Sequence, residues 1–90
     1  MKIGGIYYDV IHKTNEELNG NVGLADFNRQ EISINTEHTM QTQRIALIHE
    51  VLHILDNTYS LKLTEEQVTF TAHALVSLIE DNKEFLKSFL

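Results

Sequence analysis

The chain has 90 residues, a formal net charge of −6, only seven Lys and Arg residues and no cysteine. These values exclude disulfides and thiolate metal sites. They also argue against a nucleic-acid or anionic-membrane partner, because such partners bind through clustered positive charge. The length predicts that residues 1–90 form one small domain. Without an apolar run of membrane-spanning length or a signal peptide at the start, the sequence predicts a cytoplasmic protein.

The first third of the chain predicts β-structure. Residues 2–3 and 6–12 flank a Gly-Gly dipeptide, which suits a tight hairpin. Residues 22–27 and 31–35 predict a second hairpin about residues 28–30, because apolar and polar side chains alternate in its second strand. We therefore expect a small antiparallel sheet of three or four strands.

The rest of the chain predicts helices. A first helix is expected from about Thr39 to Asn57, and a second begins at Thr64, where Thr64 and Gln67 fit a capping box. The second helix has apolar residues at three- and four-residue spacing: Val68, Ala72, Leu75, Val76 and Ile79. A last helical turn is expected to pack on the domain through Phe85, Leu86, Phe89 and Leu90. Strands followed by two main helices predict an α+β fold.

The most informative string in the chain is His49-Glu50-Val51-Leu52-His53, an HExxH motif. Residues four apart lie on one face of a helix, so both imidazoles can bind one Zn²⁺ ion. Glu50 then lies beside the metal, where a base for a bound water belongs. The surrounding residues 44–55 are otherwise almost entirely apolar, and polar groups in a buried helix need partners. We therefore expect a metal site at this motif.

A zinc site that performs chemistry usually has three protein ligands, so the sequence should supply a third. The downstream candidates are Asp56, Glu65, Glu66 and His73. Glu65 extends the apolar stripe of the second helix, whereas Glu66 falls on a mixed, more exposed face. Asp56 lies roughly 10 Å along the helix axis from His49, which suits a hydrogen-bond acceptor for a ligand imidazole better than a ligand. Glu65 is the preferred ligand, and Glu66 and Asp56 remain alternatives.

Other polar residues have a weaker claim to function. The remaining histidines are expected at the surface: His12, His38 and His73. Three tyrosines could donate a hydrogen bond to an oxyanion, although each also suits the edge of the core: Tyr7, Tyr8 and Tyr59.

The HExxH motif, followed by Glu65-x-x-Val68-Thr69-x-x-Ala72, resembles the ImmA/IrrE-like metallopeptidases of phages, mobile elements and bacteria. The resemblance covers roughly residues 20–82 and is greatest to very short phage-encoded members, in which a small sheet precedes two helices. Larger relatives usually have Ala-Asn where this chain has Val68-Thr69, and their Leu-Met-Pro helix end is absent here.

This resemblance implies a minimal zincin-like fold, with His49, His53 and Glu65 as zinc ligands and Glu50 as the catalytic acid/base. The implied reaction is hydrolysis of a peptide bond, in which zinc polarises the scissile carbonyl and Glu50 moves the proton of the attacking water. In relatives the substrate is typically a repressor or other regulator, so a phage or host transcription factor is the expected protein substrate.

Three further expectations concern substrate binding and alternative functions. The strand at residues 31–35 is expected to be a sheet edge to which an extended peptide substrate adds. One alternative function is a zincin-like module that binds zinc but cleaves nothing. The other is a metal-free interaction domain in which the HExxH string is accidental.

Overall fold

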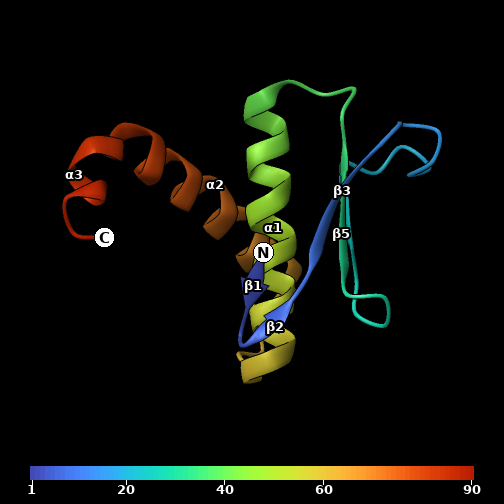
Figure 1. Ribbon diagram of the computed structural model, residues 1–90, viewed down its shortest axis with the longest axis horizontal. Helices are drawn as coiled ribbons and strands as arrows, with labels where there is room; N and C mark the ends of the chain where they lie inside the picture. Colours follow the sequence, from blue (N-terminus) through green and yellow to red (C-terminus); the bar gives the residue numbers. More distant parts are fainter.

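A computed structural model of residues 1–90 shows five short strands in two small sheets, followed by three helices (Figure 1). The strands are β1 (Lys2–Ile3), β2 (Ile6–Tyr7), β3 (Asp9–Lys13), β4 (Gly23–Asp26) and β5 (Glu31–Asn35). The helices are α1 (Met40–Tyr59), α2 (Glu65–Asp81) and α3 (Lys83–Lys87). The predicted α+β class is confirmed. None of the three helices has both the length and the apolar character needed to cross a membrane.

Two hairpins form where the sequence predicts them. Strands β1 and β2 pair antiparallel across Gly4 and Gly5, which have φ angles of 56° and 85° and so need residues without a side chain. Strands β4 and β5 pair antiparallel across residues 27–30. The prediction of a wholly antiparallel sheet is wrong, because β3 pairs parallel with β5 and the three strands lie in the order β3-β5-β4.

The strand at Glu31–Asn35, β5, is the central strand of the larger sheet. Both of its edges are hydrogen-bonded, to β3 and to β4, so the expectation that it forms a free edge is wrong. Its last four residues are buried, including the polar Ser33 and Asn35, as expected of a strand that is paired on both sides and covered by a helix. Alternation of side chains shows which face of a strand is buried but not which strands flank it. The edge strand that contacts α1 is β4.

Side-chain caps fix the helix boundaries. Thr39 caps α1 by accepting a hydrogen bond from the backbone N–H of Thr42 at 3.2 Å, and the left-handed Ser60 ends the helix. The predicted capping box of α2 is present: Gln67 N–H donates to Thr64 Oγ1 at 3.1 Å, and Thr64 N–H donates to Gln67 Oε1 at 2.9 Å. The predicted starts of both main helices are therefore confirmed.

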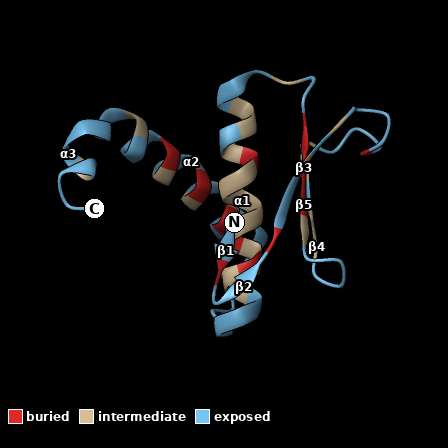
Figure 2. Cartoon of the chain, viewed as in Figure 1, coloured by how far each residue is buried: buried red, intermediate tan, exposed pale blue.

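Helix α1 lies between the sheet and the first half of α2, as Figure 1 shows. One buried cluster joins the sheets to α1 through Ile3, Tyr8, Ile32, Ile34, Ala46 and Ile54. A second joins α1 to α2 through Leu52, Val68 and Ala72. Buried residues lie on β5 and where α2 meets α1 (Figure 2). Because both faces of α1 are covered, polar side chains in its middle lie in partly enclosed surroundings.

The end of α2 and α3 extend beyond α1 as an arm (Figure 1). The prediction that the last turn packs on the domain is wrong: Phe85 is 63% exposed and Phe89 is 75% exposed. Helix α3 contacts only α2. The physical reason is that the end of α2 touches α1 on one face only, through the buried Val76 and the Arg44–Glu80 ion pair, and α3 continues beyond that contact.

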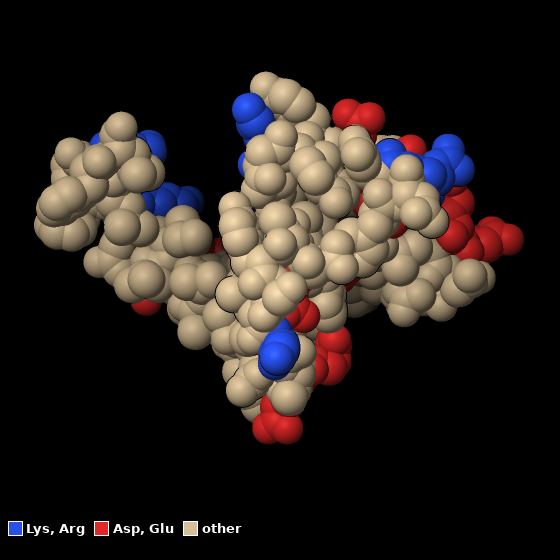
Figure 3. Space-filling view, turned by 90° about the horizontal axis from the view of Figure 1, so that it is seen from below, with Lys and Arg blue, Asp and Glu red and all other residues tan.

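Charge is distributed unevenly over the molecule. Figure 3 shows most Asp and Glu side chains of one face away from the arm, whereas Lys or Arg side chains lie both beside them and on the arm. One ion pair connects α1 to α2, between Arg44 Nη1 and Glu80 Oε1 at 3.5 Å. An exposed pair of this length contributes little stability, so apolar contacts near the start of α2 determine how the helix sits.

Candidate metal centre

The two histidines of the HExxH motif lie side by side on α1. Their ring centroids are 4.8 Å apart, and the Nε2 atoms of His49 and His53 approach to 3.1 Å. A four-residue spacing produces this arrangement because it places both side chains on one face of the helix, a turn apart. Both residues are partly buried.

Glu65, the first residue of α2, brings its carboxylate to both imidazoles. Its Oε1 lies 2.8 Å from Nε2 of His49, and its Oε2 lies 3.1 Å from Nε2 of His53. The capping box at Thr64 fixes the start of α2 and so places Glu65 opposite α1. The structure therefore brings together the three residues that the sequence predicts as ligands.

The three residues lie close enough to hold one metal ion, because their ligand atoms are all within 4.8 Å of one another. Zinc bonds of about 2.0–2.1 Å at tetrahedral angles place ligand atoms about 3.3 Å apart, close to the contacts seen here. Two imidazole nitrogens and one carboxylate oxygen also form a donor set that suits zinc.

Hydrogen bonds alone do not satisfy this cluster. Each neutral imidazole has at most one hydrogen on Nε2. If both imidazoles donate these hydrogens to the carboxylate of Glu65, no hydrogen is left for the 3.1 Å contact between the Nε2 atoms of His49 and His53. A cation among the three groups can accept a lone pair from each of them, so the donor set fits a metal ion.

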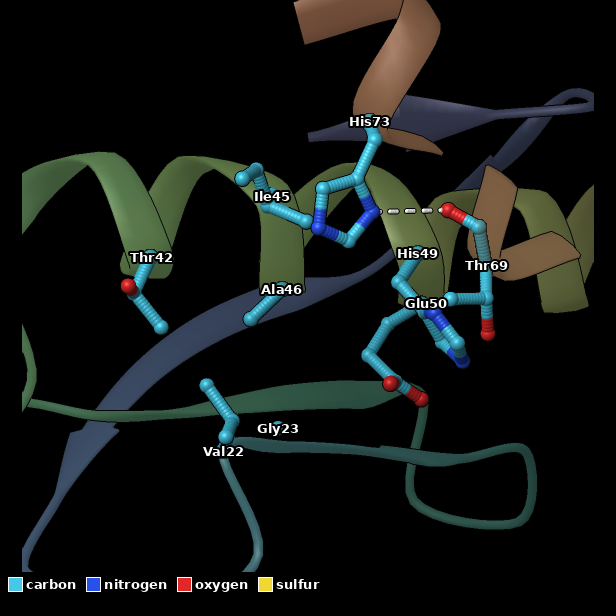
Figure 4. A pocket seen from close by; sticks show the side chains of 9 residues that line it. All are labelled: Val22, Gly23, Thr42, Ile45, Ala46, His49, Glu50, Thr69 and His73. Carbon is cyan, nitrogen blue, oxygen red and sulfur yellow. Dashed lines mark hydrogen bonds between the residues drawn. The ribbon is translucent and has the colours of Figure 1, made fainter. Parts of the chain in front are cut away.

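Glu50 lies outside the ligand cluster and points toward the sheet rather than toward α2 (Figure 4). Burial raises the pKa of its carboxyl above the usual value, because the charged form loses solvation. The nearby His49 and His53 partly oppose this increase, whereas Glu65 adds to it. A glutamate whose pKa is raised toward neutrality is suited to general acid–base chemistry.

A cavity of about 330 Å³ lies directly beside His49 and Glu50. It is enclosed by α1, by α2 and by the start of β4, as Figure 4 shows. Gly23 on β4 allows Glu50 to pack there: a Cβ atom at this position would lie 3.3 Å from Cγ of Glu50. The candidate catalytic group therefore faces a space large enough for part of a substrate.

His73 has a place at this cavity that the sequence analysis missed. It is exposed, as predicted, but its ring also lines the cavity. The signal was available in the spacing, because Glu65, Thr69 and His73 follow one another at four-residue intervals on one face of α2. That face includes the candidate ligand Glu65, so its neighbours belong at the same site.

The other candidates lie elsewhere. Asp56 accepts a hydrogen bond from the backbone N–H of Leu63 at 3.2 Å and so ties the α1–α2 connection back to α1. Glu66 is exposed and outside the ligand cluster. Tyr7 and Tyr59 are exposed, and Tyr8 is in the core. None of these tyrosines lines the cavity, and neither do the two remaining histidines, His12 and His38.

Comparison of the chain with known protein families, curated proteins and solved structures gives no match. The resemblance to the ImmA/IrrE-like metallopeptidases therefore stays a prediction from the residues themselves. A functional proposal rests on the geometry of His49, His53 and Glu65, with Glu50 beside them.

Proposed function

We propose that the protein is a zinc-dependent metallopeptidase. The observation that carries this proposal is the convergence of His49, His53 and Glu65, with the partly buried carboxyl of Glu50 adjacent and a cavity beside it. Three protein ligands leave a fourth position for water, which distinguishes a catalytic zinc site from a closed structural one. A zinc ion held there would supply a water of lowered pKa and would polarise a carbonyl.

The residues of the chain have separate tasks in this proposal. Glu50 takes a proton from the attacking water and returns it to the leaving amine. Strand β4, the edge of the sheet nearest Glu50, offers unpaired backbone groups to an extended substrate. This assignment replaces the strand at Glu31–Asn35, which is central. The resemblance to ImmA/IrrE-like proteins adds a phage or host regulatory protein as the proposed substrate.

A second candidate is a zinc-binding module without activity. It is favoured by the position of the ligands, which come from two helices, so that a bound ion would cross-link α1 to α2. Small domains often depend on such a staple. Under this reading Glu50 has no chemical task.

Metal analysis and a cleavage assay test the proposal together. Purified protein should contain about one zinc per chain, as a three-ligand site requires. His49→Ala should lose the zinc, and His12→Ala, which changes an exposed histidine, should keep it. Zinc-loaded wild type should cleave a mixture of unfolded proteins, and Glu50→Gln should bind zinc without cleaving. Cleavage that persists in Glu50→Gln contradicts the proposal, and zinc binding without any cleavage supports the second candidate.

A further inference from the structure

The cavity beside His49 and Glu50 has a lining of its own that the proposed chemistry does not use. Figure 4 shows α1 along one side, the start of β4 below and His73 of α2 above. At about 330 Å³ it is at the small end of ligand cavities, which range over roughly 300–1,000 Å³. It therefore suits one side chain rather than several residues of a substrate.

The wall away from the metal ligands is mostly carbon. Val22, Ile45 and Ala46 contribute apolar side chains. Thr42 turns its methyl group toward the cavity in Figure 4, and its hydroxyl accepts a hydrogen bond from Oγ1 of Thr39 at 3.0 Å. The wall thus offers few free polar groups to a ligand.

At the rim, the ring of His73 is held in place by a hydrogen bond. Its Nδ1 lies 2.9 Å from the carbonyl oxygen of Thr69, and a carbonyl can only accept, so Nδ1 donates. One ring nitrogen, Nε2, remains free at this exposed position. Water can solvate it there, so the enclosed part of the cavity is the apolar part.

Two small residues keep the space open. Gly23 of β4 and Ala46 of α1 lie opposite each other in the lining of the cavity, and a Cβ atom on Gly23 would lie 3.4 Å from Cβ of Ala46. Larger side chains at either position would fill the space next to Glu50. The size of the cavity is therefore determined by residues adjacent to the candidate base.

We propose that this cavity binds one apolar side chain, of the size of Leu, Met or Phe, from the residue next to the scissile bond of the substrate. This inference rests on the proposed peptidase function and adds the substrate class to it. The cleaved carbonyl must lie beside Glu50, and successive residues of an extended peptide are about 3.3 Å apart. A neighbouring side chain therefore reaches a cavity that begins at Glu50.

A series of alkyl hydroxamates tests the cavity separately from activity, because the hydroxamate group binds zinc and the alkyl chain can enter the space. Affinities for zinc-loaded protein are measured by calorimetry, starting from acetohydroxamate. Each methylene that enters the cavity should tighten binding about fourfold until the space is filled. Acetohydroxamate itself reports only on the metal centre.

Two variants and two matched controls test whether the gain in hydroxamate affinity with chain length comes from this cavity. Thr42→Phe should remove the gain from longer chains, and Ile45→Ala should shift the optimum to a larger, aromatic chain. Ile48→Ala is the control for Ile45, because both pack against the same buried cluster but only Ile45 lines the cavity. Gln41→Phe is the control for Thr42, as an exposed neighbour. All four variants should bind acetohydroxamate as wild type does.

The outcomes separate the two proposals. An affinity that stays flat along the series, with acetohydroxamate bound, overturns the cavity assignment and leaves the metal centre intact. Failure of acetohydroxamate to bind zinc-loaded protein overturns both. In cleaved protein mixtures, Glu50-dependent sites should have an apolar residue beside the broken bond. Sites without such a preference overturn the assignment while the peptidase function stands.

Discussion

The two halves of α2 have similar apolar patterns and different surroundings. In the first half, Val68 and Ala72 are completely buried against α1, and Glu65 reaches the two histidines. In the second half, Val76 is still buried, but Leu78 is 53% exposed and Ile79 is 43% exposed, and α3 continues outward. A three- and four-residue spacing thus defines the apolar face of a helix, whereas contact with a second element decides whether that face is buried. Only the first half of α2 contributes residues to the site.

The largest effect should come from the carboxylate that joins the two helices. We expect Glu65→Ala to weaken zinc binding by more than about 100-fold, because even loss of a group that only supports a ligand costs 10–100-fold. Glu66→Ala, one residue along on the same turn, should leave the affinity unchanged, since Glu66 is outside the cluster. Competition with a chelating dye measures both. Equal losses in the two variants would contradict the assignment of Glu65 as the third ligand.

The next effect concerns packing within the same helix. Val68→Ala should lower the free energy of unfolding by about 2 kcal/mol, because it leaves a cavity in the α1–α2 cluster. Leu78→Ala removes more atoms but from an exposed position, and should change it by less than about 0.5 kcal/mol. Urea denaturation of both variants in the presence of a chelator gives the two values. A cost for Leu78→Ala as large as that for Val68→Ala would show that the arm is covered in solution.

These contrasts also mark the limits of prediction from sequence. The HExxH face, the capping box at Thr64 and the face of α2 on which Glu65 lies could be predicted because each depends on spacing within one helix. The central position of β5 could not, because strand alternation carries no information on neighbours. The exposed arm could not be predicted either, because its apolar spacing resembles that of the buried half.

His73 illustrates the same limit at the site. Its position on the face of Glu65 is a local property that the sequence contains. Its place at the cavity depends on the distance between α1, α2 and β4, which no single periodicity specifies. Residues supplied to a site by one element were therefore predictable, and those that depend on three elements were not.

A smaller effect is expected at Glu50, which is partly buried between α1 and β4. Because the pKa of Glu50 is raised in the folded protein, the protonated carboxyl favours folding and the charged carboxylate opposes it. The stabilisation is fully present below the pKa of the unfolded chain, about 4.3, and is lost as the pH rises through the pKa of the folded protein. In chelator, Glu50→Gln should therefore raise the free energy of unfolding at pH 7.5 by about 1 kcal/mol, at the expense of activity. The gain should vanish near pH 4. Lower stability of the variant at pH 7.5 would show that the charged carboxylate is favoured by the fold.

The smallest effect is expected from removing the end of the arm. A chain that ends at Asn82 loses α3, which contacts only α2. The rings of Phe85 and Phe89 lie 5.1 Å apart and contact each other within the removed segment. Thermal unfolding of the shortened chain should therefore shift by less than about 4 °C, which corresponds to roughly 0.5 kcal/mol for a domain of this size.

Zinc affinity and the hydroxamate series should be unchanged in this shortened chain, since its first half of α2 is intact. A larger thermal shift that depends on protein concentration would mean that the exposed apolar residues of the arm pair with a second molecule. A larger shift that does not depend on concentration would mean that the arm folds back on α1. Either result would show that the arm is covered in solution, whereas an unchanged protein would confine both stability and the candidate metal centre to residues 1–82.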